Sequence, residues 1–245
     1  MIVSEIMTTK LVTINHDDTL SHAANLFRQY QFHHLPVVRT VKHRTSDVNQ
    51  TVYTSKLLFE GLLTSQDIDL VVAVAKQSAS GDILHAPWQE QRVMEVMHRA
   101  SLRVTPNTSV AAAAQILVER GLNALPVVEY EHIESDTHTL LVGLLTRSDL
   151  LIALARSLGA YEPGMELVLQ LPMGDLKPLA QTLLLASELH VQIRSILASP
   201  LEGNMPRSAT LRLGTINPAP LLVRLQAAAI QYTFAEPLME GDEHD

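Results

Sequence analysis

The chain has 245 residues, 47% of them hydrophobic, so it is long enough to bury one large core or several small ones, and disorder is not its expected state. Its formal net charge of −8 argues against nucleic-acid binding, because proteins that bind nucleic-acid phosphates normally present a basic face. The absence of cysteine excludes disulfides and thiolate zinc sites. With neither a basic signal-peptide segment nor an apolar run of ~18 residues, the sequence predicts a cytoplasmic protein without a membrane span.

The first 77 residues predict a β-α-β-β-α unit. Apolar residues at i, i+3, i+4 and i+7 indicate a helix, and short β-branched runs indicate strands. A polar stretch between two apolar runs is typical of a loop. In chain order the predicted elements are a helix capped by Thr19 with Leu20, Ala23, Ala24 and Phe27 on its apolar face, a strand at Leu35–Val38, an enlarged loop at Arg39–Lys56, a strand ending at Leu63 and a helix over 65–76.

The same pattern returns in residues 93–160. Met7 and Met97 are 90 residues apart, as are Leu35 and Leu125, whereas Gly61 and Gly143 are 82 apart, so the first copy carries extra residues between the two blocks. Internal repeats of this kind indicate two similar units that pack together and share a core. The predicted elements of the second copy are a helix capped by Thr108 with Val110, Ala113, Ala114 and Leu117 on its apolar face, a turn with positive φ at Gly121, a strand at Leu125–Val128, a strand ending at Leu145 and a helix over 147–158.

The segment 78–92 is interpreted as a linker between the copies. It contains glycine, proline and the single tryptophan, Trp88. Two placements of Trp88 stay open: packing on the seam between the repeats, or a lone position on the surface.

A Gly-x-x-Thr-x-x-Asp block ends the second strand of each copy. Thr64 is then expected at a helix N-cap with Asp67 at the third helical position, and Thr146 and Asp149 repeat the arrangement. A helix N-terminus has unpaired N–H groups and a partial positive charge, which suit a phosphate, and a carboxylate one turn further can accept hydrogen bonds from a ribose. Arg147 adds a cation. The same residues also form a capping box, which needs no ligand.

Three motifs in order, found twice, resemble those of the CBS-domain family, arranged as a tandem pair over roughly residues 1–158. They are Val-x-Glu-x-Met, a Pro-Val-Val strand, and the Gly-x-x-Thr-x-x-Asp block. The resemblance implies that the threonines contact phosphate and the aspartates contact ribose. It also implies that the residues before each Pro-Val-Val strand contact adenine. The implied nucleotide-binding residues are Thr64, Asp67, Thr146, Asp149, Arg147, His33, His34, Asn123 and Ala124.

Metal binding and catalysis are not expected. His33 and His34 are adjacent on a predicted strand, so their side chains point to opposite faces. The 11 histidines show no metal-ligand spacing, and the sequence has no nucleophile–base pair, P-loop or Gly-x-Gly-x-x-Gly motif. We therefore predict a protein that is not an enzyme and has no cofactor, with a nucleotide only as a regulatory ligand.

The last third predicts a separate βαββαβ domain over 165–236. Leu167, Leu169 and Leu171 alternate with polar residues as in a half-buried strand, and the tail 237–245 is acidic and expected to be disordered. The predicted elements are a strand at 165–173, a helix from Asp175, strands at 191–198 and 209–216, a helix from Pro218 and a strand at 230–234. The order is similar to that of the ACT domain, a ferredoxin-like regulatory fold. A CBS pair followed by such a domain resembles acetoin-utilisation proteins.

The fold class is thus α/β, with tandem CBS repeats and a ferredoxin-like, ACT-like domain. The favoured function is a non-catalytic sensor that binds AMP, ADP, ATP or an S-adenosylmethionine-like ligand between the repeats and relays binding to the ACT-like domain or to an unknown protein partner. The alternative is a ligand-free module for structure or oligomerisation. A homodimer is expected in either case.

Overall fold

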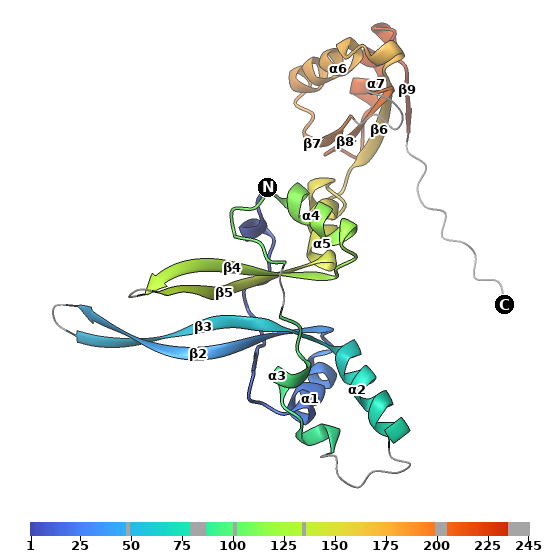
Figure 1. Ribbon diagram of the computed structural model, residues 1–245. Helices are drawn as coiled ribbons and strands as arrows, with labels where there is room; N and C mark the ends of the chain where they lie inside the picture. Colours follow the sequence, from blue (N-terminus) through green and yellow to red (C-terminus); the bar gives the residue numbers. More distant parts are fainter. Residues whose placement is uncertain (48–49, 79–86, 100–101, 134–135, 199–204, 235–245) are drawn as a thin grey trace. The chain divides into compact units, whose positions relative to one another are not determined.

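The computed structural model describes residues 1–47, 50–78, 87–99, 102–133, 136–198 and 205–234, and Figure 1 shows their helices and strands. Its contacts divide the chain into two compact units, Met1–Leu150 and Leu151–Asp245. The predicted acidic tail and most of the predicted linker lie outside the described residues. Each unit is considered by itself below.

The first unit contains both repeats, and their predicted element order is present. The elements from the first repeat are η1 (Val3–Glu5), β1 (Ile14–Asn15), α1 (Leu20–Tyr30), β2 (His34–Asp47), β3 (Gln50–Thr64) and α2 (Ser65–Ser78). Those that follow are η2 (Trp88–Glu90), α3 (Val93–Val96), α4 (Val110–Glu119), β4 (Ala124–Ile133), β5 (Asp136–Thr146) and α5 (Arg147–Ser157), which continues into the second unit. The counterpart of β1 in the second repeat is a single parallel bridge between Val104 and Val127.

One five-stranded sheet joins the two repeats, in the order β1-β2-β3-β5-β4. The two hairpins lie side by side (Figure 1), and Leu58 of β3 is opposite Leu140 of β5. Side chains from both hairpins form a common buried cluster consisting of Val38, Phe59, Val128 and Leu141. The predicted shared core is therefore confirmed.

The short helical turns that open the two repeats, η1 and α3, are called the opening turns here, and each packs into the core of the other repeat. Val3 of η1 is fully buried in the core of the second repeat, together with Leu117 and Leu125. Val93 of α3 is fully buried in the core of the first repeat, among residues such as Leu20. Each repeat thus completes its hydrophobic core with a turn that begins the other repeat. Trp88 also packs against the first-repeat core, so it lies neither on the seam nor alone on the surface.

The helix caps were predicted correctly in the first repeat but not in the second. The Thr19 hydroxyl accepts a hydrogen bond from the amide of His22, as expected of an N-cap. In the second repeat the cap is Ser109, whose hydroxyl accepts from Ala112, and Thr108 instead accepts from the amide of Thr105. The prediction of Thr108 as the cap was wrong by one residue.

The predicted enlarged loop at 39–56 is also wrong. β2 and β3 have 14 and 15 residues, whereas β4 and β5 have 10 and 11. The additional residues therefore lengthen both strands of one hairpin, which pair in continuous register from Val38 opposite Phe59 to Asp47 opposite Gln50. The sequence of this segment lacks the apolar alternation by which strands are recognised, which is why it resembles a loop.

The second unit has the predicted βαββαβ order. Its elements are β6 (Met165–Gln170), η3 (Pro172–Gly174), α6 (Lys177–Glu188), β7 (Ile193–Leu197), β8 (Ser208–Leu213), α7 (Ala219–Ala227) and β9 (Tyr232–Phe234). The strand order is β7-β8-β6-β9 with every neighbouring pair antiparallel, which is the arrangement of a ferredoxin-like sheet. Several bounds differ from the prediction. β6 ends at Gln170, β8 ends at Leu213 rather than at 216, and α6 begins at Lys177, whose amide donates to Asp175 Oδ1.

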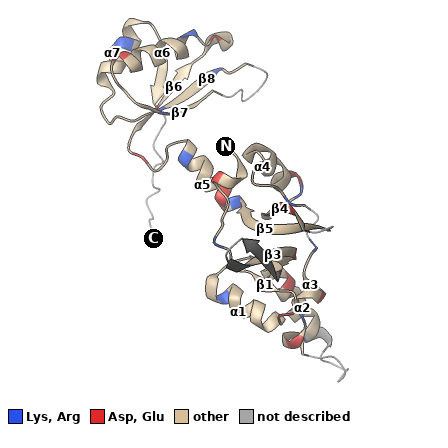
Figure 2. Cartoon of the chain, turned by 90° about the vertical axis from the view of Figure 1, so that its left-hand side faces the viewer, with Lys and Arg blue, Asp and Glu red and all other residues tan. Residues whose placement is uncertain are grey.

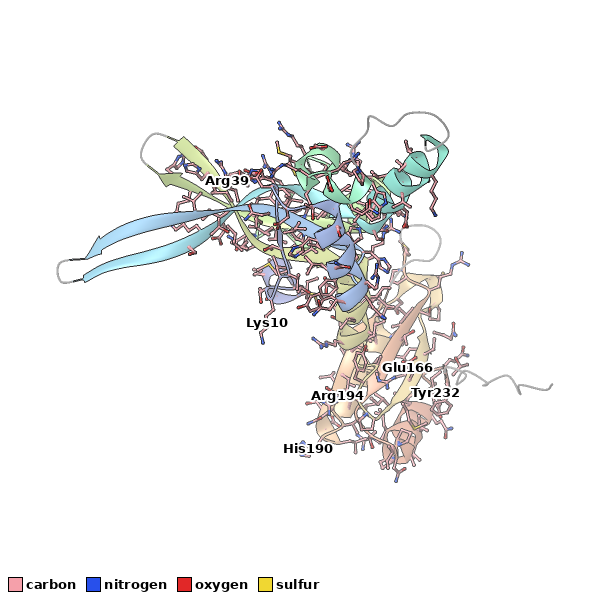
Figure 3. The ribbon with its side chains drawn as sticks, turned by 90° about the horizontal axis from the view of Figure 1, so that it is seen from below. Lys10, Arg39, Glu166, His190, Arg194 and Tyr232 are labelled. Carbon is pink, nitrogen blue, oxygen red and sulfur yellow. The ribbon has the colours of Figure 1, made fainter. Side chains whose placement is uncertain are left out.

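The two faces of this second sheet differ in character. Alternate residues of β6 and β8, including Leu167, Leu169 and Leu211, are fully buried with Leu221 and Leu225 of α7. On the other face Arg212 donates to Glu166 at 2.8 Å, and Arg194 pairs with Glu162 at 2.8 Å. Glu166 and Arg194 are labelled in Figure 3. Within the described residues, none of the helices is both long and apolar enough to span a bilayer.

Candidate functional site

Both Thr-x-x-Asp blocks form complete capping boxes at the starts of α2 and α5. The amide and hydroxyl of Thr64 donate to Asp67 Oδ2 at 2.8 and 2.7 Å, and the Asp67 amide donates back to the Thr64 hydroxyl at 3.2 Å. The amide and hydroxyl of Thr146 both lie 2.8 Å from Asp149 Oδ2, with the return bond at 3.1 Å. Each aspartate therefore uses one oxygen to hold its helix N-terminus in place.

The segment after each opening turn passes directly beside the capping box of the other repeat. Leu62 and His98 exchange two backbone hydrogen bonds of 2.9 Å, and Leu144 and Thr8 form the equivalent pair at 2.9 and 3.0 Å. A Cβ on Gly61 would lie 2.6 Å from the carbonyl oxygen of His98. The glycine that opens the Gly-x-x-Thr-x-x-Asp motif is thus required by the close approach of the His98 backbone.

A cavity of about 870 Å³ lies between the repeats and reaches the N-termini of both α2 and α5. This volume falls within the usual range of small-molecule pockets, about 300–1,000 Å³. The predicted residues Thr64, Thr146 and Arg147 line it. So do the four predicted adenine-contact residues, His33, His34, Asn123 and Ala124.

A second, smaller cavity of about 130 Å³ contains Thr8, Lys10, His33, His34 and Thr146 among its lining residues. Its lining residues show that the surroundings of each capping box come from both repeats. Thr146 is near the opening segment and the pre-strand residues of the first repeat. In the larger cavity Thr64 is accompanied by the corresponding second-repeat residues, His98, Leu122, Asn123 and Ala124. We therefore name the Thr64–Asp67 region site I and the Thr146–Asp149 region site II.

The two predicted aspartates, Asp67 and Asp149, are not among the lining residues of either cavity, and other side chains contact them. His98 Nε2 is 2.7 Å from Asp67 Oδ1, and Thr8 Oγ1 is 3.4 Å from Asp149 Oδ1. Sequence reasoning missed both His98 and Thr8. The signal that could have found them is the 90-residue offset, since both follow the methionine of the Val-x-Glu-x-Met motif.

Burial, hydrogen bonding and nearby charges shift the pKa values of Asp67 and His34. Burial raises the pKa of Asp67, but hydrogen bonds from Thr64 and His98 outweigh that effect, so its pKa lies below the ordinary value. Burial lowers the pKa of His34, assisted by the charge of His33 and opposed by that of Asp67. Asp67 is therefore an anion and His34 is neutral near neutral pH.

Basic side chains near the two sites come from different segments. Arg147 and Arg99 line the larger cavity, and Lys10 lines the smaller one. Arg147 begins α5 and donates to the Leu117 carbonyl at 3.3 Å. Lys10, in the loop before β1, is labelled in Figure 3, and Figure 2 shows acidic and basic residues interspersed over the first unit. Among the described residues, no group of three or more His, Cys, Asp or Glu could hold a metal ion.

Comparison with known families identifies the class of domain that this arrangement forms. The model of the CBS domain matches residues 3–45 and 93–156. Both matched segments lie mainly within the first unit and include both opening turns. The chain therefore contains tandem CBS domains, in agreement with the repeats seen in the sequence.

Individual relatives are distant in sequence. YhcV, a CBS domain-containing protein of Bacillus subtilis (strain 168), is 26% identical over 150 residues, which cover 61% of this chain and 83% of YhcV. Among solved structures, CBSX2 in complex with AMP is 21% identical, with a TM-score of 0.43 and coverage of 62% of this chain and 95% of CBSX2. AcuB of Vibrio cholerae, linked by name to acetoin utilization, is 25% identical, with a TM-score of 0.44 and coverage of 66% and 98%.

Proposed function

We propose that this protein is a non-catalytic regulatory sensor that binds an adenine nucleotide between its two CBS repeats. The observation that carries the proposal is that two capped helix N-termini, Thr64–Asp67 and Thr146–Asp149, open toward one cavity of about 870 Å³. Tandem CBS domains generally have regulatory rather than catalytic roles, which is consistent with this site.

The chemistry of the cleft suits a phosphorylated nucleoside. Gln66 and Ser148 stand at the second position of their helices and line the cavity, where their amide groups would reach a bound phosphate. Arg147 would supply a positive charge beside it. Oδ1 of each aspartate, the oxygen that does not hold the helix cap, would accept a hydrogen bond from a ribose hydroxyl. At site I, Leu122, Asn123 and Ala124 would border the base.

Binding would alter the spacing of the two repeats, and this change would be transmitted to another part of the protein or to a partner. A ligand that contacts both repeats favours the arrangement in which those contacts are made, and only such differential affinity transmits a signal. The receiver in this proposal is the ferredoxin-like second unit, which we propose to be ACT-like, or a protein partner. A homodimer and a cytoplasmic location belong to the same proposal.

Thermal unfolding with and without AMP tests the nucleotide site. AMP is the first choice of probe because it is the ligand in the CBSX2 structure. A ligand at ~100 times its Kd stabilises a protein by about 2.7 kcal/mol, which for this length corresponds to a rise in Tm of roughly 5–10 °C. ADP, ATP and S-adenosylmethionine are tested in parallel. The rise should vanish in the double variant Asp67→Ala, Asp149→Ala, and a rise that persists there would disprove the site.

A ligand-free assembly module is the second candidate, and one observation favours it. Both capping boxes are complete without any ligand, so Thr64, Asp67, Thr146 and Asp149 already have a structural role. This candidate predicts that no adenine compound raises Tm, while the double aspartate variant still lowers it through loss of two caps. Sedimentation would then show a stable dimer whose association does not respond to AMP.

A further inference from the structure

The two sites differ in the atom that a ribose would have to contact. At both sites the aspartate Oδ2 accepts two hydrogen bonds, from the amide and the hydroxyl of the threonine three residues earlier, and so holds the helix cap. Oδ1 is therefore the oxygen left for a ligand. At site I it already has a short contact, 2.7 Å, with His98 Nε2, whereas at site II its neighbour is Thr8 Oγ1 at 3.4 Å.

The His98 contact is a hydrogen bond of the strong kind. An ionised carboxylate only accepts, so the imidazole N–H must be the donor. Bonds to charged acceptors are shorter and stronger than neutral ones, and 2.7 Å lies at the short end of their range. An O–H···O contact of 3.4 Å is longer than the usual 2.5–3.0 Å and contributes little.

His98 can leave Asp67 without disturbing the core. Its side chain is 68% exposed, whereas that of Asp67 is 14% exposed. The backbone of His98 is held separately by its two hydrogen bonds to Leu62, so rotation of the side chain alone would free Oδ1. The obstacle at site I is thus a single exposed side chain rather than a collapsed pocket.

We infer that His98 competes with the nucleotide for Asp67 and so makes the two sites unequal: site II fills first, and site I fills only when its ligand displaces the imidazole. The inference rests on the proposed nucleotide-binding function. Displacing one charge-assisted hydrogen bond at an exposed position should weaken site I by roughly tenfold relative to site II.

Titration calorimetry of the full chain with AMP tests this, with each site measured alone. Asp149→Ala leaves site I and Asp67→Ala leaves site II, and thermal unfolding checks that both variants remain folded. The exchanged pair His98→Thr and Thr8→His then swaps the two competing side chains. We expect His98→Thr to tighten AMP binding roughly tenfold in the Asp149→Ala background, and Thr8→His to weaken it roughly tenfold in the Asp67→Ala background.

A measurement on the unmodified chain avoids any effect of the lost caps. The NMR signals of the His98 ring, assigned by their loss in His98→Thr, should stay in place during the first, tighter phase of AMP binding and shift during the second. A shift of the His98 ring in the first phase, or equal AMP affinity with and without His98→Thr, would overturn the inference while leaving the proposed function intact. AMP binding that survives loss of both aspartates, or no AMP binding in any variant, would overturn both.

Discussion

The amide of Val3 donates to the carbonyl oxygen of Thr108 at 2.9 Å, and this hydrogen bond connects the start of the chain to the second repeat. The Val3 side chain is fully buried there. The reciprocal bond runs from the amide of Val93 to the carbonyl of Asp18, also at 2.9 Å, in the first repeat. These two contacts define the exchange of opening turns and lead to a direct test.

Truncating either valine should destabilise the repeat that receives it rather than the one it begins. Val3→Ala removes buried methyl groups, and a loss of about 1–2 kcal/mol is expected. Amide hydrogen exchange should then accelerate in α4 and β4, and Val93→Ala should accelerate exchange in α1 and β2 instead. Faster exchange in α1 of Val3→Ala, with α4 unchanged, would contradict the exchanged packing.

The second-repeat cap provides a matched pair of variants. Ser109→Ala removes the side-chain acceptor for the Ala112 amide and should lower the free energy of unfolding by about 1 kcal/mol. Ala112 exchange should accelerate at the same time. Thr108→Ala leaves that cap in place, and its effect should be confined to the turn around Thr105. Urea unfolding together with exchange at Ala112 would distinguish them, and loss of Ala112 protection in Thr108→Ala would refute the assignment.

Asp67 should contribute stability that disappears in acid. Its pKa in the folded protein lies below the ordinary value of 3.8, so the folded state holds the proton less tightly than the unfolded state does. The contribution is therefore present above about pH 4 and is lost as the pH falls through the folded pKa. Asp67→Asn should lower stability near pH 6 and flatten its decline between about pH 5 and pH 3. Unfolding curves at several pH values measure this, and an unchanged slope would contradict it.

Shortening the long hairpin should leave the nucleotide site intact. Deleting residues 42–45 together with their partners 52–55 removes four paired positions per strand and keeps the in–out alternation. The remaining pair Lys56–Glu131, at 2.6 Å, still links the two hairpins. We expect cooperative unfolding and an unchanged AMP-induced rise in Tm. Loss of the AMP response alone would show that the hairpin takes part in binding.

A methyl group at Gly61 should affect site I selectively. The added Cβ would stand 2.6 Å from the His98 carbonyl, so the segment 97–98 has to move. Gly61→Ala should therefore weaken AMP binding in the Asp149→Ala background and leave it unchanged in the Asp67→Ala background. Gly143→Ala is the matched variant, because its Cβ would stand 2.5 Å from Met7 Sδ and 3.3 Å from the Thr8 carbonyl oxygen, beside site II. Equal effects of Gly61→Ala on both sites would refute this placement.

Much of the architecture could be predicted from the sequence because it repeats there. The Thr-x-x-Asp spacing places Thr64 and Thr146 at helix N-caps, and the i, i+3, i+4, i+7 pattern identifies α1 and α4. The exchange of Val3 and Val93 could not be predicted in this way. Two copies of one pattern offer equivalent cores, and periodicity alone does not say which copy a short turn joins.

Only some of the residues at the two sites could be predicted from the sequence. The lining residues Thr64, Thr146, Arg147, Asn123 and Ala124 follow from motif position. His98 belongs to no motif, and its importance comes from a backbone pairing with Leu62 over a gap of 36 residues in sequence. Its role also depends on a difference between the copies, imidazole in one and hydroxyl in the other, whereas repeat analysis looks for what the copies share.

The exchange of the opening turns has a consequence for synthesis of the chain. During translation the first repeat emerges without Val93, which packs in its core, and 101 residues separate Val3 from Val104, the first of its partners in the core of the second repeat. Contacts of such long sequence separation slow folding, because loop-closure entropy must be overcome before they stabilise the chain. Neither repeat is then a complete folding unit, and a ribosome-bound chain ending before Val93 should remain protease-sensitive until the second opening turn has been made.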